Sequence, residues 1–255
     1  MKKLTSLIVI LCCCTIVFAQ QNNSNNNNNN NKNNNDHKKI FVGLSFGPTI
    51  DWFAPKLTDI EREKAKAGFI TGVNIDINVT KPKFLYFSTG ILIRYLQGGL
   101  DFNHEYHFAE PIDASLELPT TRIYQTTYLT LPTGIKLRTK LLKGCVISGK
   151  IGLYHNFKLG EAQFDNFKLP SDYLDSQYFV STAKKKDNNH AALFAESAYV
   201  GVGFEYAFKQ GIRVLANIDY SCQFNYFNPN AKSNVSNAQF KSLVHSLHIV
   251  VGVLF

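Results

Sequence analysis

The sequence predicts an all-β chain that folds as an eight-stranded antiparallel up-and-down transmembrane β-barrel with short periplasmic turns and long extracellular loops. Apolar residues recur at every second position in eight stretches, which is typical of strands with one buried face. Most stretches have ten or more residues, which suits a tilted strand that crosses a bilayer better than an ordinary strand of about five or six. Long and short connections alternate between them, as in outer-membrane barrels.

The chain begins like an exported protein. Two basic residues, Lys2 and Lys3, precede an apolar run over residues 4–18 and a small residue, Ala19, that suits signal-peptidase cleavage. We therefore expect residues 1–19 to be a signal peptide. A lipoprotein signal at one of the three adjacent cysteines in the run is the alternative, but the run continues past them. A run of about 15 apolar residues is too short for a transmembrane helix, which needs roughly 20.

The segment after the predicted signal is almost entirely asparagine. Residues 20–38 contain nothing apolar to bury, so we expect a disordered periplasmic tail. Residues 39–255 are long enough for one all-β domain, which we assign to the barrel. Removing Lys2 and Lys3 lowers the formal net charge from +8 to +6. In an exported chain this mild excess favours anionic lipid headgroups over nucleic acid, which we exclude as a partner.

The strands and their connections follow one another in a regular order. The eight predicted strands are 39–50, 67–79, 84–96, 123–139, 145–157, 191–208, 212–224 and 241–255. Tight turns at Lys81-Pro82-Lys83 and Lys209-Gln210-Gly211 carry the residues that favour turns. Four long loops, 51–66, 97–122, 158–190 and 225–240, alternate with three short connections, which are the two tight turns and a short turn at 140–144 between the fourth and fifth strands. An even number of strands places both termini in the periplasm.

Each predicted strand has one apolar and one polar face. The residues expected to face lipid are Phe87, Thr89, Ile91, Ile93 and Tyr95; Val200, Val202, Phe204, Tyr206 and Phe208; Ile212, Val214, Ala216, Ile218 and Tyr220; and Leu247, Ile249, Val251, Val253 and Phe255. A soluble barrel that binds a small apolar ligand has the same alternation with the faces reversed. Aromatic residues near the strand ends favour the membrane, because barrels carry aromatic girdles at both interfaces. The expected girdle residues are Tyr86, Phe87, Tyr95, Tyr154, Tyr206, Phe208, Tyr220, Phe224 and Phe255.

The polar faces predict a charged lumen. Its expected members are the bases Arg94, Lys136, Arg138, Lys150 and Arg213 and the acids Asp76, Glu205 and Asp219. An eight-stranded barrel is just wide enough to be filled by side chains, so these charges must pair in a polar core. A gated path for protons or small ions is the functional alternative.

Some eight-stranded barrels modify lipid A, so a catalytic site on the lipid face is an alternative. His245 and Cys222 are both expected to face outward near the extracellular side. Nucleophilic catalysis also needs a third group to orient the base, and no acidic residue is evident on that face. Ser246 points the other way by strand parity. We therefore expect no catalytic residues, no cofactor and no metal. "HEYH" (His104 to His107) has the wrong spacing for a zinc-protease motif.

The two cysteines outside the signal peptide are expected to be free thiols. Cys145 begins a strand on the periplasmic side, and Cys222 ends a strand on the opposite side. A disulfide needs α-carbons within about 7 Å, which is far less than a membrane thickness.

Several strand sequences resemble the PorT-like outer-membrane β-barrel family of Bacteroidetes. They are "ILIRYLQGG", "TTYLTLPTGIKLR", "SGKIGLYHNFKLG", "SAYVGVGFEYAF" and the final "VGVLF". The most specific element is the run Tyr128, Leu129, Leu131 and Pro132, followed by a basic pair. The resemblance implies an eight-stranded barrel without an assigned activity, and one branch of the family takes part in protein secretion.

The last strand resembles the terminal signal that the barrel-insertion machinery reads, with Gly252 and Phe255 as its marks. We therefore expect a structural or interaction component of the outer membrane without catalytic activity. Its expected partners are the bilayer, lipopolysaccharide, the insertion machinery and secretion-system or other envelope proteins. The alternatives are the soluble ligand-binding barrel and a lipid-A-modifying enzyme.

Overall fold

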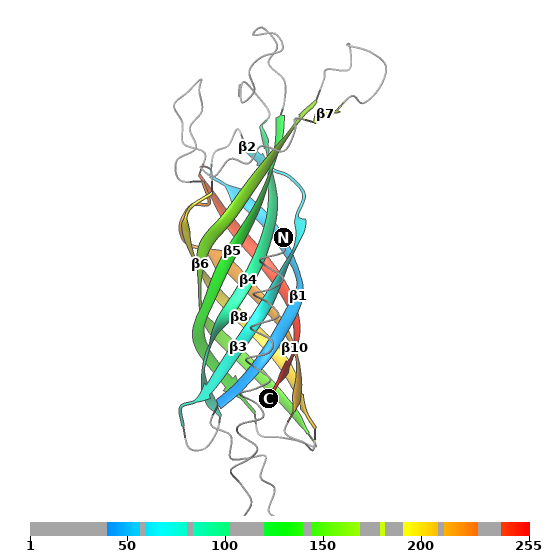
Figure 1. Ribbon diagram of the computed structural model, residues 1–255. Helices are drawn as coiled ribbons and strands as arrows, with labels where there is room; N and C mark the ends of the chain where they lie inside the picture. Colours follow the sequence, from blue (N-terminus) through cyan, green and yellow to red (C-terminus); the bar gives the residue numbers. More distant parts are fainter. Residues whose placement is uncertain are drawn as a thin grey trace, which may run out of the picture.

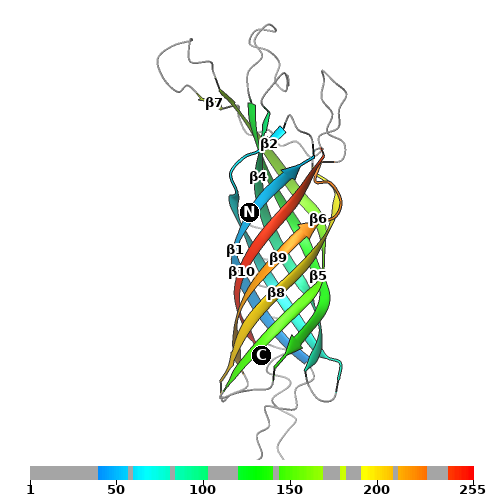
Figure 2. The same cartoon turned by 180° about the vertical axis from the view of Figure 1, so that it is seen from behind.

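The computed structural model describes residues 40–56, 60–80, 84–102, 120–139, 144–168, 179–181, 191–208, 212–228 and 241–255. These residues form a tall barrel of tilted strands (Figures 1 and 2). The barrel strands are β1 (Ile40–Pro55), β3 (Lys66–Asn78), β4 (Leu85–Phe102), β5 (Thr120–Arg138), β6 (Cys145–Lys168), β8 (Phe194–Ala207), β9 (Arg213–Gln223) and β10 (Ser242–Leu254). Two short strands, β2 (Ile60–Arg62) and β7 (Phe179–Ser181), pair with β4 and β6. We call the end that carries β2 and β7 the upper end, and the end that carries Phe255 the lower end.

The eight long strands close on themselves. Each pairs antiparallel with the next long strand along the chain, and β10 returns to pair with β1, for example at Gly43 and Leu254. The backbone N–H of Phe255 donates to the carbonyl of Val42 at 2.8 Å, so the ladder continues to the last residue. The predicted eight-stranded antiparallel up-and-down barrel is therefore confirmed. Within the described part of the chain, no helix is long and apolar enough to span a bilayer.

Several strands are longer than the sequence predicted. β1 continues to Pro55 instead of ending at residue 50, because the alternation persists, with Trp52 half-exposed outside and Phe53 buried inside. The prediction was wrong here because Asp51, a charged residue, was taken as the start of a loop. β6 continues to Lys168 instead of ending at residue 157, and β2 and β7 lie in stretches predicted as loops.

The outer surface of the barrel is apolar. The large apolar side chains that are exposed include Phe46, Phe87, Ile91, Ile151, Val200, Val202, Phe204, Ile218, Ile249 and Val251. Such a continuous exposed apolar surface is unfavourable in water, so it marks contact with lipid. The inward positions carry the charges, with Arg94, Lys136 and Glu205 all buried. The predicted sidedness is confirmed, and the soluble ligand-binding barrel, whose apolar face would point inward, is not favoured.

Two residues of the predicted aromatic girdles lie inside the barrel instead. Tyr86 and Tyr154 are 3% and 4% exposed, and Tyr154 stacks on Tyr199 with ring centres 4.3 Å apart. The prediction considered only nearness to a strand end, whereas strand parity puts both residues on the inward face. Phe87 and Phe208 are exposed, as expected of girdle residues.

Buried apolar side chains gather at three heights in the lumen. The upper cluster consists of Phe53, Ile60, Leu96, Leu100, Tyr124, Tyr128, Ala191, Ala195, Phe227 and Val244. The middle cluster consists of Ile70, Leu92, Tyr154, Tyr199 and Val250, and the lower of Phe41, Tyr86, Leu215 and Leu254. The charged side chains lie in the same lumen, which is therefore packed as a mixed polar and apolar core.

Candidate functional site

The charged residues near the lower end form one compact ion cluster. Lys136 Nζ lies 3.0 Å from Asp76 and 2.6 Å from Glu205, and Arg138 lies 2.6 Å and 3.0 Å from the same two carboxylates. Arg213 Nη1 adds a longer contact to Glu205 at 3.6 Å. The five side chains come from β3, β5, β8 and β9, so the cluster joins strands across the barrel interior. We call these five residues the lower ion cluster.

Aromatic rings enclose the arginines of the lower ion cluster. The Arg138 guanidinium lies 4.1 Å from the ring centre of Tyr86 and 4.9 Å from that of Phe41. The Arg213 guanidinium lies 4.5 Å from the Phe41 ring. Cation–π contacts add to ion pairing where water is excluded. The inward Tyr86 thus shields the cluster instead of anchoring the barrel in an interface.

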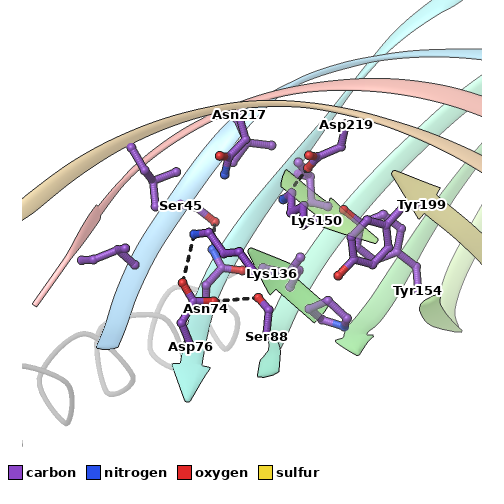
Figure 3. Close-up of a pocket in the computed structure, with 16 residues that line it drawn as sticks. Ser45, Asn74, Asp76, Ser88, Lys136, Lys150, Tyr154, Tyr199, Asn217 and Asp219 are labelled. Atoms are coloured by element: carbon purple, nitrogen blue, oxygen red, sulfur yellow. Dashed lines mark hydrogen bonds and ion pairs between the residues drawn. The ribbon is translucent and has the colours of Figure 1, made fainter. Parts of the chain in front are cut away.

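A second ion pair joins Lys150 of β6 and Asp219 of β9 next to the middle cluster (Figure 3). Lys150 Nζ lies 2.7 Å from Asp219, and the Lys150 ammonium also lies 5.7 Å from the ring centre of Tyr199. Asp219 fits because the inward position opposite it is Gly201, where an added Cβ would lie only 2.0 Å from its Oδ1 atom. Gly201, the first glycine of "VGVGF", therefore makes room for the buried carboxylate of Asp219.

Arg94 has a partner that the sequence did not identify. Its Nη2 atom lies 2.9 Å from Asp51 Oδ1, and Ser246 hydrogen-bonds to both residues. Thr49 donates to the other oxygen of Asp51 at 2.9 Å. The sequence predicted five bases and three acids in the lumen, and Asp51 supplies a fourth acid. All eight predicted lumen residues thus lie inside the barrel, in three groups instead of one ladder.

The space left among these groups is small. A cavity of about 30 Å³ lies between the lower ion cluster and the Lys150–Asp219 pair, with Asn74 and Tyr154 in its wall (Figure 3). This is room for about two water molecules. Small-molecule sites have volumes of about 300–1,000 Å³, so this cavity does not fit an organic ligand.

The upper apolar cluster fills the lumen above the lower ion cluster, the Lys150–Asp219 pair and Arg94. Phe227 is fully buried, and its ring centre lies 4.7 Å from that of Phe53 and 5.4 Å from that of Tyr124. The Ala191 N–H donates to both oxygens of Glu161 at 3.0 Å, which holds the entry to β8 against β6. The sequence did not predict this contribution of Phe227 to the upper apolar cluster, because Phe227 lies beyond the predicted end of its strand. Among the described residues, no group of His, Cys, Asp and Glu side chains is arranged to hold a metal ion; "HEYH" lies outside them.

The outward pair considered for catalysis is engaged with aromatic residues. His245 and Cys222 are both half-buried on the outward face, as the sequence predicted, and they are register partners on β10 and β9. His245 Nδ1 lies 2.7 Å from the Tyr220 hydroxyl, and the ring stacks on Trp52 with centres 5.8 Å apart. In the described structure no carboxylate contacts His245, so the orienting third group is missing. Cys222 and Cys145 are both free thiols, as predicted.

The two residues predicted as the terminal insertion signal lie at the β1–β10 seam. Gly252 is buried, and an added Cβ would lie 2.4 Å from the Leu44 carbonyl oxygen. Phe255 is exposed on the apolar surface near the lower end. Both residues therefore contribute to the seam that closes the barrel. That the insertion machinery recognises them stays a prediction.

A closed antiparallel barrel with a lipid-facing apolar surface and a charged, filled lumen defines an outer-membrane β-barrel protein. Residues 18–225 match the family described as the outer membrane protein beta-barrel domain, and the chain belongs to this family. A search of curated proteins finds no match.

Several solved structures match the chain at low sequence identity. Neisserial surface protein A is 10% identical, with a TM-score of 0.37, over 85% of this chain and 96% of that chain. The attachment invasion locus protein Ail of Yersinia pestis, solved with the heparin analogue sucrose octasulfate, is 12% identical, with a TM-score of 0.33, over 86% and 100%. The outer membrane protease OmpT from Escherichia coli is 10% identical, with a TM-score of 0.30, over 85% and 96%. At these scores, none assigns an activity to the chain.

Proposed function

We propose that the chain is a PorT-like outer-membrane barrel that acts as a closed structural or interaction component and conducts nothing through its lumen. The observation that carries this is the filled interior: paired charges in the lower and middle parts, and Phe227 packed into the upper apolar cluster. A filled barrel offers partners only its outer wall and its ends. The proposed partners are lipopolysaccharide, the insertion machinery and envelope proteins, including components of protein secretion.

Two lysines near the upper end support contact with lipopolysaccharide. The ammonium groups of Lys56 and Lys241 each lie 5.2 Å from the ring centre of Tyr226, and the Lys56 N–H donates to the Lys241 carbonyl at 2.9 Å. In the described residues neither ammonium has a carboxylate partner. Adjacent cations just above an apolar wall are suited to the phosphate groups of lipid A.

We also propose an orientation of the barrel in the outer membrane, with the two lysines at the extracellular end. Residues 1–19 would be a signal peptide, residues 20–38 a periplasmic tail, both termini periplasmic and the upper end extracellular. Lys56→Cys and Thr139→Cys, each in a background without other cysteines, test it, because both positions are exposed at opposite ends. A membrane-impermeant maleimide on intact cells should label the cysteine at 56 only. Labelling at 139 alone would reverse the orientation.

The closed lumen is tested by conductance. The protein is extracted in detergent, checked by its heat-modifiable migration on a gel, and reconstituted into planar bilayers. We expect no stable single-channel currents, with a porin of known conductance as the positive control. Steady ohmic currents from the folded protein would overturn the proposal. Recovery of all the protein in an aqueous extract would instead favour the soluble barrel.

A further inference from the structure

Three polar side chains form a hydrogen-bonded row on the outer wall of the barrel. The Thr133 hydroxyl lies 3.0 Å from His155 Nε2, and His155 Nδ1 lies 3.1 Å from Glu196 Oε1. They belong to the neighbouring strands β5, β6 and β8, and His155 and Glu196 are register partners. His155 and Glu196 alternate with buried neighbours, and Thr133 lies on the same face of β5 as the exposed Ile135 and Leu137, so all three point outward.

The protonation pattern of this row follows from its acceptors. An ionised carboxylate can only accept, so Glu196 fixes the proton of His155 on Nδ1. Nε2 is then left to accept the hydrogen of the Thr133 hydroxyl. Hydroxyl, imidazole and carboxylate in this order are the nucleophile, the general base and the orienting group of hydrolases that form acyl intermediates. His245 lacks this arrangement, because its Nδ1 faces the Tyr220 hydroxyl.

The row lies near the upper end of the apolar surface, where the exposed aromatic residues Phe157 and Phe194 lie one outward position above His155 and Glu196. Glu196 is two residues from the upper end of β8, and the exposed Tyr206 lies ten residues further down the same strand. Ten residues at about 3.4 Å, tilted by about 40°, span about 26 Å, which matches the apolar band of about 25 Å in such barrels. Lipid acyl esters lie at this depth, between hydrocarbon and headgroups.

The row is accessible from the lipid. The side chains of His155 and Glu196 are 26% and 41% exposed. Beside Thr133 on the neighbouring strand lies its register partner Leu153, which pairs in turn with Ala198, so an apolar surface on which an acyl chain can lie adjoins the hydroxyl. Polar groups on a lipid-facing wall are costly, so a hydrogen-bonded row of three needs an explanation there.

We propose that Thr133, His155 and Glu196 hydrolyse an ester-linked acyl chain of a membrane lipid. Thr133 Oγ1 attacks the ester carbonyl as His155 Nε2 takes its proton, and the C–O bond to the lipid alcohol breaks as that proton passes to the leaving oxygen. Water then attacks the acyl-threonine with His155 as base, which releases the fatty acid and restores the hydroxyl. Glu196 is a positioning residue that holds the imidazole. This activity goes beyond the structural role proposed above and differs from the sequence-based expectation of no catalytic residues.

The test uses the full chain in two sets of vesicles, one of phosphatidylethanolamine and phosphatidylglycerol and one that also contains lipopolysaccharide. Free fatty acid and the masses of the remaining lipids are measured. We expect release in at least one set, and the lipid that becomes lighter by one acyl group identifies the source. Thr133→Val and His155→Gln should lower the rate by at least about 100-fold, whereas Thr133→Ser should retain it. Glu196→Gln should lower kcat by about 100-fold or more with little change in KM.

His245→Gln is the matched control, because this histidine also faces outward near the upper end, and we expect an unchanged rate. Each variant is checked for heat-modifiable migration. If a variant does not fold, a fluorophosphonate probe on the wild-type barrel gives the answer, since it should phosphonylate Thr133 with loss of fluoride and fail to do so after heating. No release from folded protein in either set, or release that Thr133→Val and His155→Gln leave unchanged, would overturn the proposal. Neither outcome bears on the conductance test of the closed lumen.

Discussion

Glu205→Gln is expected to destabilise the barrel more than any single change on its lipid face. Glu205 is fully buried and accepts from Lys136 at 2.6 Å and from Arg138 at 3.0 Å, with Arg213 at 3.6 Å. The five residues of the lower ion cluster carry a net charge of +1, which the substitution raises to +2. At an effective dielectric constant of about 20, each 3 Å contact contributes about 5 kcal/mol of attraction. Desolvation offsets most of this, so the expected net loss of unfolding free energy is about 3–5 kcal/mol.

The assay is urea unfolding of the barrel in lipid vesicles. The chain has a single tryptophan, Trp52, on the outward face of β1, so its fluorescence reports the loss of contact with lipid. Heat-modifiable migration provides an independent measure of the folded fraction. Both should show a lower midpoint for Glu205→Gln than for the wild type.

A paired substitution is the matched control. Lys136→Met with Glu205→Gln returns the net charge of the lower ion cluster to +1, and replacing a buried ion pair by uncharged groups is often nearly neutral. The double variant should therefore be more stable than Glu205→Gln alone. A Glu205→Gln barrel within about 0.5 kcal/mol of the wild type would refute the argument, because it would mean that water already screens these charges.

Two further outcomes follow from the packing of the lumen and of the seam. Phe227→Ala should lower the free energy of unfolding by about 3–5 kcal/mol, because it empties a fully buried position, whereas Phe224→Ala, at an exposed position, should cost much less; urea titration compares them, and equal losses would contradict the contribution of Phe227 to the upper apolar cluster. Gly47→Val should prevent barrel closure, because the added Cβ would lie 1.9 Å from the Ile249 carbonyl oxygen of β10. Gly149→Val is the control, because a Cβ at Gly149 meets nothing within 4 Å. Only Gly149→Val should give the heat-modifiable band of a folded barrel.

The faces of the strands could be read from the sequence, because strand parity is a local property. Alternation alone placed Arg94, Lys136 and Glu205 inside and Val200 outside, as observed. Pairing across the lumen could not be read in this way, because it depends on the stagger of the strands around the whole barrel. Asp51 was missed for this reason, since nothing near it in the chain indicates that Arg94 lies opposite.

The row of Thr133, His155 and Glu196 was missed for a related reason. The three residues are separated by 22 and 41 positions, and no short motif joins them. Parity does place each on the outer face, but their common height depends on the register of β5, β6 and β8. The outward histidine that the sequence singles out is His245, whereas His155 lies within "SGKIGLYHNFKLG", a strand that resembles the family as a whole without marking a site.

One wall of the described barrel is taller than the rest at the upper end (Figure 1). β6 continues eleven residues beyond Phe157, the last position that it shares with β8. At about 3.3 Å per residue and a tilt of about 40°, this extension rises about 28 Å above the rim, where it remains paired with β5. If the upper end is extracellular, the paired β5–β6 extension would hold its tip well outside the membrane, where antibodies, phages or neighbouring cells could contact it.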